Sequence, residues 1–230
     1  MTLDQLLAKM CEDWDARACL NAMHYIATGQ SDWNVEAFYE SGELFVALAL
    51  GPWLPTIHEG RPWEARVLEI GCGAGRLTRA LSHIFGEVHA VDVSGEMVKI
   101  AREACPQAHI HQNNGMDLRV VPNDQPFDLA ICYILFQHIP SYAVIESYMR
   151  ETHRLLRPGA PFWFQVQGAA VDAQEGDTWV GVGFSEEQLR EMAGRCGWDA
   201  AYIKNSGTQE CLCFWYRDAG GLKASSPPVD

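Results

Sequence analysis

The stretch Arg66-Val67-Leu68-Glu69-Ile70-Gly71-Cys72-Gly73-Ala74-Gly75 decides the fold of this chain. Its first five residues are mostly apolar and predict a buried strand that ends where the glycines begin. After the loop, apolar residues recur at helical spacing until Gly86: Leu77, Ala80, Leu81, Ile84 and Phe85. A strand, a glycine-rich loop and a helix in this order are typical of the first unit of a doubly wound α/β sheet.

The same alternation of strands and helices continues to about residue 167. Further short apolar runs predict strands at 88–92, 108–111, 127–133 and 162–166. Ser94 and Ser141 are suited to cap the helices between these strands, and Pro158-Gly159 ends the second helix. Strict alternation implies parallel strands joined by right-handed crossovers.

The C-terminal part of the chain departs from this alternation. Ser185-Glu186-Glu187-Gln188 is a capping box that predicts one more helix. Two strand-like runs follow at 200–204 and 210–216, and the turn residues Asn205-Ser206-Gly207 between them predict a hairpin. We therefore expect an α/β fold with a doubly wound, mostly parallel seven-stranded sheet and a C-terminal antiparallel hairpin.

The chain divides into three parts. Residues 1–60 are helical in character and too few for a separate domain, so we expect them to cover the ligand end of the sheet or pack on its edge. Residues 61–217 form the ligand-binding α/β domain. Residues 218–230, rich in serine and proline, are expected to be a disordered tail.

Composition excludes several classes of function. The formal net charge of −13 and the scattered distribution of the 17 basic residues argue against a nucleic-acid partner. No apolar run reaches the ~20 residues that a membrane helix needs, and the start of the chain lacks the features of a signal peptide. We therefore expect a cytoplasmic protein that binds neither nucleic acid nor membrane.

The cysteines and histidines do not predict a metal site. None of the eight cysteines forms a C-x-x-C pair, and Cys211 and Cys213 point to one face of a predicted strand, which favours packing in the core. His109 and His111 alternate in another predicted strand but have no evident third ligand. We expect no bound metal.

The glycine loop is suited to an adenosine cofactor. Gly71, Gly73 and Gly75 let the backbone turn sharply and let a ligand approach closely. Nicotinamide enzymes need a third small residue where this chain has Arg76, and Glu69 would repel a pyrophosphate. A carboxylate at that position suits a cofactor that carries an ammonium group.

A second carboxylate follows at the end of the next predicted strand. Asp92, 23 residues after Glu69, can accept both ribose hydroxyls of an adenosine. It can also be a simple turn residue before Ser94. Because both cofactor classes use such a carboxylate, Asp92 supports adenosine without distinguishing between them.

These segments together resemble class I S-adenosylmethionine-dependent methyltransferases. Residues 67–78 are similar to the first motif of that family, and residues 88–98 to the second. Residues 114–118 fall where the family binds adenine, residues 127–139 resemble its fourth strand and following loop, and residues 154–160 its turn before strand five. The five segments occur in the family's order and cover about residues 60–215, which implies a Rossmann-like methyltransferase fold.

The resemblance implies a role for individual residues in binding S-adenosylmethionine and its product S-adenosylhomocysteine. Glu69 is expected to hold the methionine ammonium, and Asp92 the ribose. Asn114 takes the position that contacts the adenine edge, where the family more often has Asp, with help from the Gly115 backbone. The remaining cofactor positions implied are Gly71, Cys72, Gly73, Val93, Met97, Met116 and Tyr133.

The acceptor side is less well defined by the sequence. Methyl transfer needs alignment of the acceptor and exclusion of water, and a base only when the acceptor must lose a proton. His138 is the candidate base and Tyr133 a second candidate catalytic residue, although His138 can equally serve only to shape its loop. Residues 24–42 and 168–183 are expected to line the acceptor site, without room for a large recognition domain.

The sequence therefore predicts an S-adenosylmethionine-dependent methyltransferase that transfers a methyl group to a small molecule by in-line displacement. Homo-oligomer formation is possible on this prediction. Two alternatives remain at this point: a non-catalytic S-adenosylmethionine-binding or accessory protein, and a nicotinamide-dependent oxidoreductase.

Overall fold

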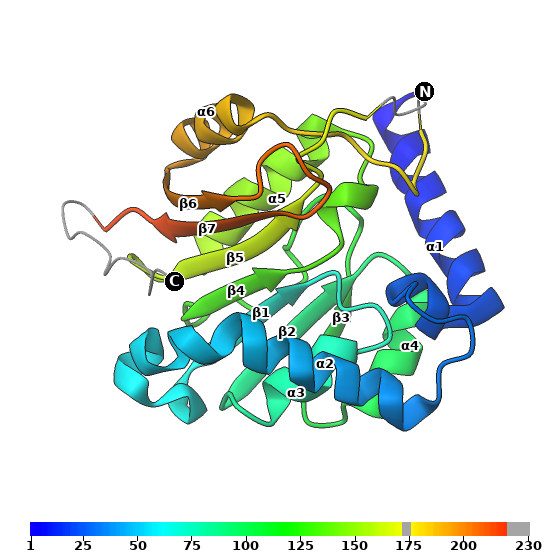
Figure 1. Ribbon diagram of the computed structural model, residues 1–230, viewed down its shortest axis with the longest axis horizontal. Helices are drawn as coiled ribbons and strands as arrows, with labels where there is room; N and C mark the ends of the chain where they lie inside the picture. Colours follow the sequence, from blue (N-terminus) through cyan, green and yellow to red (C-terminus); the bar gives the residue numbers. More distant parts are fainter. Residues whose placement is uncertain (172–175, 220–230) are drawn as a thin grey trace.

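A single seven-stranded sheet forms the centre of the molecule (Figure 1). The computed structural model describes residues 1–171 and 176–219. Its strands lie in the order β3-β2-β1-β4-β5-β7-β6, and every pairing is parallel except those of β7, which is antiparallel to both of its neighbours. The strands are β1 Arg66–Ile70, β2 Glu87–Asp92, β3 His109–Gln112, β4 Leu129–Cys132, β5 Pro161–Val166, β6 Trp198–Lys204 and β7 Cys211–Arg217. The predicted sheet with its C-terminal antiparallel hairpin is confirmed.

Helices cover both faces of the sheet (Figure 1). Helices α2, α3 and α4 lie on one face, and α5 and α6 on the other, while α1 runs along the side where the parallel strands end. The helices are α1 Leu3–Ile26, α2 Val35–Leu50, α3 Arg76–Ser82, α4 Gly95–Ala104, α5 Tyr142–Leu155 and α6 Glu186–Cys196, with 3-10 segments η1 Gly51–Gly60, η2 Pro62–Glu64 and η3 Phe136–His138.

The central strands are apolar because both of their faces are buried. All residues of β1 and β4 are buried, and Leu68 and Ile70 face the α5 side of the sheet, whereas Val67 faces α3. The predicted helix caps are present: the Ser94 and Ser141 hydroxyls accept from backbone N–H groups of the first turn, and Ser185 forms a capping box with Gln188. Local sequence chemistry therefore fixes where these helices begin.

The N-terminal segment packs directly on the α/β core. Helix α1 contacts α4, and α2 lies along α3. The close approach of α2 requires Gly42, because a Cβ there would lie 2.1 Å from the carbonyl oxygen of Arg76. Helix α1 is interrupted at Asn21, which has non-helical backbone angles. The residues after this interruption include Ile26, which lies against Gly73.

Two expectations need qualification. The third strand spans His109–Gln112 rather than 108–111, a one-residue difference that is ordinary for strand ends. Most of the predicted tail at 218–230 lies outside the described residues, as do residues 172–175 of the predicted acceptor rim. Within the described ranges, no helix combines the length and apolar character that crossing a bilayer requires.

Candidate active site

The glycine loop lies at the carboxyl ends of β1 and β2. Gly71 and Gly73 adopt positive φ angles of 81° and 51°, which other residues rarely adopt. The N–H groups of Gly71 and Cys72 donate to the carbonyl of Val91 over 2.8 and 3.0 Å, so the loop is tied to the end of β2. These hydrogen bonds hold the backbone of the loop in place beside the end of β2.

Asp92 completes this connection between the two strands. One carboxylate oxygen accepts from the N–H of Gly73 at 2.8 Å, and the other accepts from the N–H of Ser94 at 2.9 Å. Burial raises the pKa of Asp92 above its usual value, while these backbone N–H groups and that of Val93 lower it. Each oxygen has a further lone pair, so the carboxylate can still accept hydroxyl groups.

Glu69 is a buried acid beside the loop. Its side chain is 2% exposed, and one oxygen accepts from the hydroxyl of Thr78 at 2.6 Å. Burial raises the pKa of Glu69 to about 7, against the lowering effect of Thr78 and of Arg76. The second oxygen accepts no hydrogen bond from the described residues.

Two cavities meet at this end of the sheet. The first, which we call the glycine-loop pocket, is lined by Trp14, Tyr25, Ile26, Glu69, Gly71, Cys72, Gly73, Arg76, Leu77, Asp92, Val93, Met97, Tyr133, Ile134 and Leu135. The second, the outer cleft, has a volume of about 700 Å³. Its walls come from α1, α2, the loop after β4, β5 and the segment that contains Trp179. Five residues line both: Tyr25, Ile26, Arg76, Tyr133 and Ile134.

Two side chains lie against the loop glycines. A Cβ at Gly73 would lie 2.6 Å from Ile26, and a Cβ at Gly71 would lie 2.8 Å from Leu135. Ile26 belongs to the end of α1, and Leu135 follows β4. The N-terminal segment therefore reaches the glycine loop itself.

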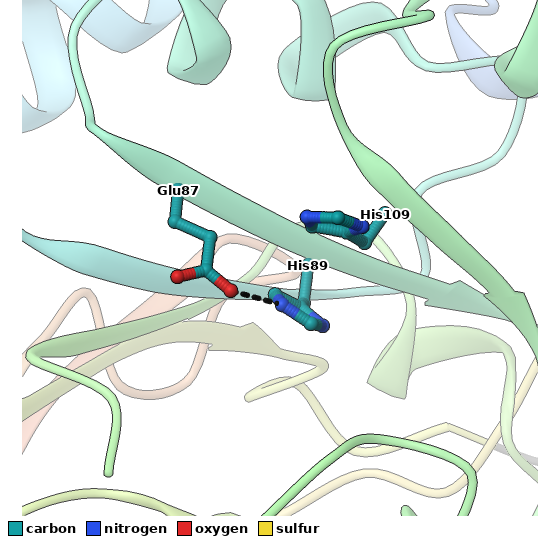
Figure 2. Close-up of side chains that lie close together, drawn as sticks. All are labelled: Glu87, His89 and His109. Carbon is teal, nitrogen blue, oxygen red and sulfur yellow. Dashed lines mark hydrogen bonds and ion pairs between the residues drawn. The ribbon is translucent and has the colours of Figure 1, made fainter. Parts of the chain in front are cut away.

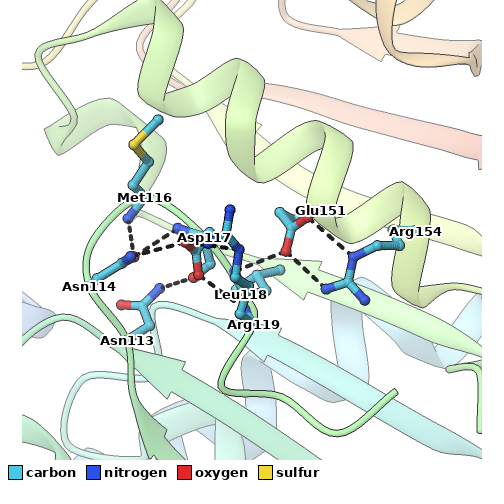
Figure 3. A network of polar contacts seen from close by, with 8 residues as sticks. All are labelled: Asn113, Asn114, Met116, Asp117, Leu118, Arg119, Glu151 and Arg154. Carbon is cyan, nitrogen blue, oxygen red and sulfur yellow. Dashed lines mark hydrogen bonds and ion pairs between the residues drawn. The ribbon is translucent and has the colours of Figure 1, made fainter. Parts of the chain in front are cut away.

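Asn113 and Asn114 differ in their surroundings (Figure 3). Asn114 is exposed, and its side chain accepts from the N–H groups of Met116 and Asp117, so it stabilises its own turn. Asn113 is buried, donates to the hydroxyl of Tyr148 at 2.8 Å, and lines a small recess next to Asp92 and Val93. The residues predicted at 114–116 line neither of the two cavities nor this recess. The structure therefore brings Asn113, rather than Asn114, beside Asp92.

Gly115 lies behind Val93. It has a φ of 79°, and a Cβ at this position would lie 3.1 Å from the Val93 side chain. Its N–H donates to the side-chain oxygen of Asn113 at 3.2 Å. Gly115 thus supports the two residues that face the recess.

His138 is buried in the wall of the outer cleft. Its Nδ1 lies 2.6 Å from the carbonyl oxygen of Trp179, so Nδ1 carries the hydrogen and Nε2 is an acceptor, 3.1 Å from the Gln137 amide nitrogen. Burial lowers the pKa of His138 to about 4. The rings of Trp14 and Trp179 lie 5.2 and 4.9 Å from the imidazole. His138 is therefore neutral at physiological pH and firmly held.

Tyr133 stands where the two cavities join. Its ring stacks on Phe45 with a centroid separation of 4.0 Å, and burial raises the pKa of its hydroxyl. The next residue, Ile134, has a φ of 55°, an outlier for a β-branched side chain. Backbone strain of this kind concentrates at functional sites. No feature of the sequence indicated the strain at Ile134.

A polar cluster lies away from this site, at the beginning of β2 (Figure 2). Glu87, His89 and His109 offer ligand atoms within 4.8 Å of one another. His89 donates to Glu87 over 2.7 Å and pairs with His111 over 3.2 Å, and Arg66 binds both oxygens of Glu87. The sequence prediction considered His109 and His111 but missed His89 as their third partner. The absence of a metal remains a prediction, supported here by hydrogen bonds that occupy both nitrogens of His89.

Comparison with known proteins agrees with the sequence motifs. Residues 67–159 match a family described as "Methyltransferase domain". The ubiquinone biosynthesis O-methyltransferases of Xanthomonas oryzae pv. oryzae and Xanthomonas campestris pv. campestris are 33% and 35% identical to this chain over 99 and 101 residues. The matches cover 41% of this chain and 40% of each relative, so the chain matches only part of the length of these relatives.

Solved structures share the fold over nearly the whole chain. Magnesium protoporphyrin IX methyltransferase of Synechocystis, with bound S-adenosylhomocysteine, has a TM-score of 0.67 at 14% identity, over 93% of this chain and 100% of that one. Phosphoethanolamine N-methyltransferase 1 of Haemonchus contortus has a TM-score of 0.71 at 14% identity, over 98% of this chain and 52% of that one. Residues 67–159 therefore match a methyltransferase domain, and the predicted resemblance of the chain to class I S-adenosylmethionine-dependent methyltransferases is confirmed.

Proposed function

We propose that the protein uses S-adenosylmethionine to methylate a small-molecule acceptor. The observation that carries the proposal is the junction of the glycine-loop pocket with the outer cleft, because a donor in one and an acceptor in the other would meet at Tyr133 and Ile134. Methyl transfer depends mainly on such alignment and on exclusion of water.

The residues of the glycine-loop pocket fit the cofactor. Glu69 has a free oxygen for the methionine ammonium, and Asp92 has lone pairs for the ribose hydroxyls. Gly71 and Gly73 have no Cβ, and one at either position would lie 2.8 Å from Leu135 or 2.6 Å from Ile26. S-adenosylmethionine supplies a methyl group on an already activated sulfonium. We assign the adenine edge to Asn113 in place of Asn114, because Asn113 lines the recess beyond Asp92.

His138 and Tyr133 remain candidates for the chemistry on the acceptor side. The acceptor nitrogen of His138 is neutral and bonded to Gln137, so His138 can take a proton only by exchanging that partner. We propose that His138 positions the acceptor and receives its proton where the acceptor must lose one.

Residues 1–60 are proposed to cover the cofactor and acceptor, since Trp14, Tyr25 and Ile26 contribute to the pocket walls. We further propose a cytoplasmic enzyme whose partners are small molecules rather than nucleic acid or membrane. The formal net charge of −13 supports this, because it disfavours polyanionic partners.

The proposal is tested by calorimetry with S-adenosylhomocysteine and, in parallel, with NAD. Binding of the first and not the second is expected. A screen with methyl-labelled S-adenosylmethionine over small amines, phenols and carboxylates then tests turnover. Tight binding of NAD would support an oxidoreductase, and cofactor binding without turnover on any acceptor would support an accessory protein.

A further inference from the structure

Arg76 is a buried cation that forms no ion pair among the described residues; burial lowers its pKa, and the more distant Tyr133 and Glu69 raise it only in part. Its residue is 8% exposed, and no carboxylate of the described residues lies within 4.0 Å of its guanidinium. Its one hydrogen bond is a long one, from Nη1 to the hydroxyl of Ser41 at 3.5 Å, and the guanidinium lies 5.9 Å from the centroid of the Phe45 ring. An unpaired buried charge is costly, and proteins rarely retain one without a use.

Two of the unsatisfied polar atoms belong to residues of the outer cleft. Among the described residues, three buried side-chain nitrogen or oxygen atoms have no hydrogen-bond partner: Nε of Arg76, Oε1 of Gln165 and Nε1 of Trp215. Arg76 and Gln165 both line the outer cleft. Buried polar atoms without partners call for an explanation, and two of these three belong to side chains that line this cleft.

The guanidinium end of Arg76 belongs to the outer cleft rather than to the cofactor side. Arg76 lines both cavities, but its neighbours Ser41 and Phe45 line only the outer cleft. Glu69, which would hold the cofactor ammonium, lines only the glycine-loop pocket; it raises the pKa of Arg76 but forms no ion pair with it within 4.0 Å. The fork of Arg76 is therefore available to the second substrate.

No other cation is present among the cleft residues that the structure describes. Glu210 is the one lining carboxylate, and it is exposed at the rim, where water weakens its field. Arg76 is buried, and an ion pair is stronger in a buried site than in water. Burial lowers the pKa of Arg76, but the guanidinium stays protonated at physiological pH. The remaining walls include the aromatic rings of Trp33, Tyr133 and Trp179. The cleft thus combines one buried fork of N–H donors with aromatic surface.

We propose that the methyl acceptor carries an anionic group, a carboxylate or a phosphoryl group, which Arg76 binds in the outer cleft. Both groups offer pairs of oxygens that match the guanidinium fork. The oxygen of Gln165 then accepts a hydroxyl or amine hydrogen from the same molecule. This inference rests on the proposed function, because it specifies the acceptor of that reaction.

Three probes of similar shape test the inference: benzoate, phenylphosphonate and uncharged benzamide. Each is titrated into the wild-type protein, with and without saturating S-adenosylhomocysteine, and followed by tryptophan fluorescence and calorimetry. We expect at least one anion to bind ten times more tightly than benzamide, and the stronger of the two identifies the anionic group. Equal binding of benzamide and both anions, or no binding of either anion, would overturn the inference.

Variants then assign the preference to its residue. Arg76→Gln should remove the preference for anions while S-adenosylhomocysteine still binds. The matched control is Arg79→Gln on the same helix, because Arg79 pairs with Glu36 and lines neither cavity. Retention of the preference in Arg76→Gln would overturn the inference. So would loss of S-adenosylhomocysteine affinity in Arg76→Gln with no change in anion binding, which would assign Arg76 to the cofactor.

Two outcomes need a further comparison: an Arg76→Gln variant that does not fold, and a wild-type protein that does not bind S-adenosylhomocysteine. If Arg76→Gln does not fold, the anion affinities of the wild type and of Arg76→Lys are compared instead. Arg76→Lys keeps the charge but loses the guanidinium fork, so it should bind the anions more weakly than the wild type. Failure of the wild type to bind S-adenosylhomocysteine would contradict the proposed function instead, and the anion selectivity measured without it would remain a separate result.

Discussion

Binding of S-adenosylhomocysteine is expected to tighten about tenfold between pH 6 and pH 8, because the ammonium group of the ligand needs an ionised Glu69. The pKa of Glu69 in the free protein is raised to about 7 by burial. About one tenth of the side chains are then ionised at pH 6, and about nine tenths at pH 8. The ammonium group of the ligand pairs with the ionised carboxylate and so lowers the pKa of Glu69. Binding is therefore stronger at pH values at which Glu69 of the free protein is already ionised.

The ionisation of Glu69 also determines how many protons are released when the ligand binds. At pH 7, binding should release about half a proton from Glu69, which calorimetry detects as an enthalpy that varies with the ionisation enthalpy of the buffer. Burial raises the pKa of Asp92 as well, so it contributes in the same direction. Glu69→Gln therefore serves to assign the effect: it should weaken binding and remove most of the pH dependence. Glu210→Gln, the same change in the outer cleft, should retain it. An affinity that is constant from pH 6 to pH 8 in the wild type would refute this account of Glu69.

Three further outcomes are expected. Asp92→Asn should weaken S-adenosylhomocysteine about 10- to 100-fold in calorimetry, because bonds to a charged acceptor contribute about 1.5–3 kcal/mol each; an unchanged affinity would exclude Asp92 as the ribose ligand. Burial lowers the pKa of His138 from 6.5 to about 4. Between these pH values His138 is protonated in the unfolded chain but neutral in the folded protein, so the free energy of unfolding falls as the pH falls from 6.5 toward 4. Urea unfolding should show a loss of about 2 kcal/mol from this group between pH 7 and pH 5, and His138→Phe should lose less than the wild type over that interval; an equal loss in both would contradict the low pKa. Protein incubated with zinc and desalted should retain less than one equivalent by elemental analysis, because Arg66 already binds both oxygens of Glu87, and one retained equivalent would instead make the cluster around His89 a metal site.

The fold followed closely from the sequence because its signals are local. The apolar run before Gly71, the caps at Ser94 and Ser141, and the turn at Asn205-Ser206-Gly207 each determine structure within a few residues. All seven strands appear where these signals predict them, within a residue or two.

The site followed less completely because it depends on contacts between distant segments. Asn113 and Asn114 are adjacent and chemically identical, and only the backbone path after β3 decides that Asn113 points to Tyr148. The isolation of Arg76 is likewise set by α2, whose Ser41 and Phe45 are its neighbours. Nothing in the sequence near position 76 shows that no carboxylate reaches it. A periodic pattern identifies an element, but an unpaired charge becomes visible only when all of its neighbours are placed.

The position of Ile26 has a kinetic consequence. Its side chain lies against Gly73 and also forms part of the wall of the outer cleft. A ligand that passes over Gly73 must move Ile26, and moving Ile26 reshapes the neighbouring cleft. Filling of the glycine-loop pocket should therefore precede productive filling of the outer cleft. Steady-state rates would then follow a compulsory order, with the methyl donor first on and its demethylated product last off, and product-inhibition patterns would distinguish this order from random addition.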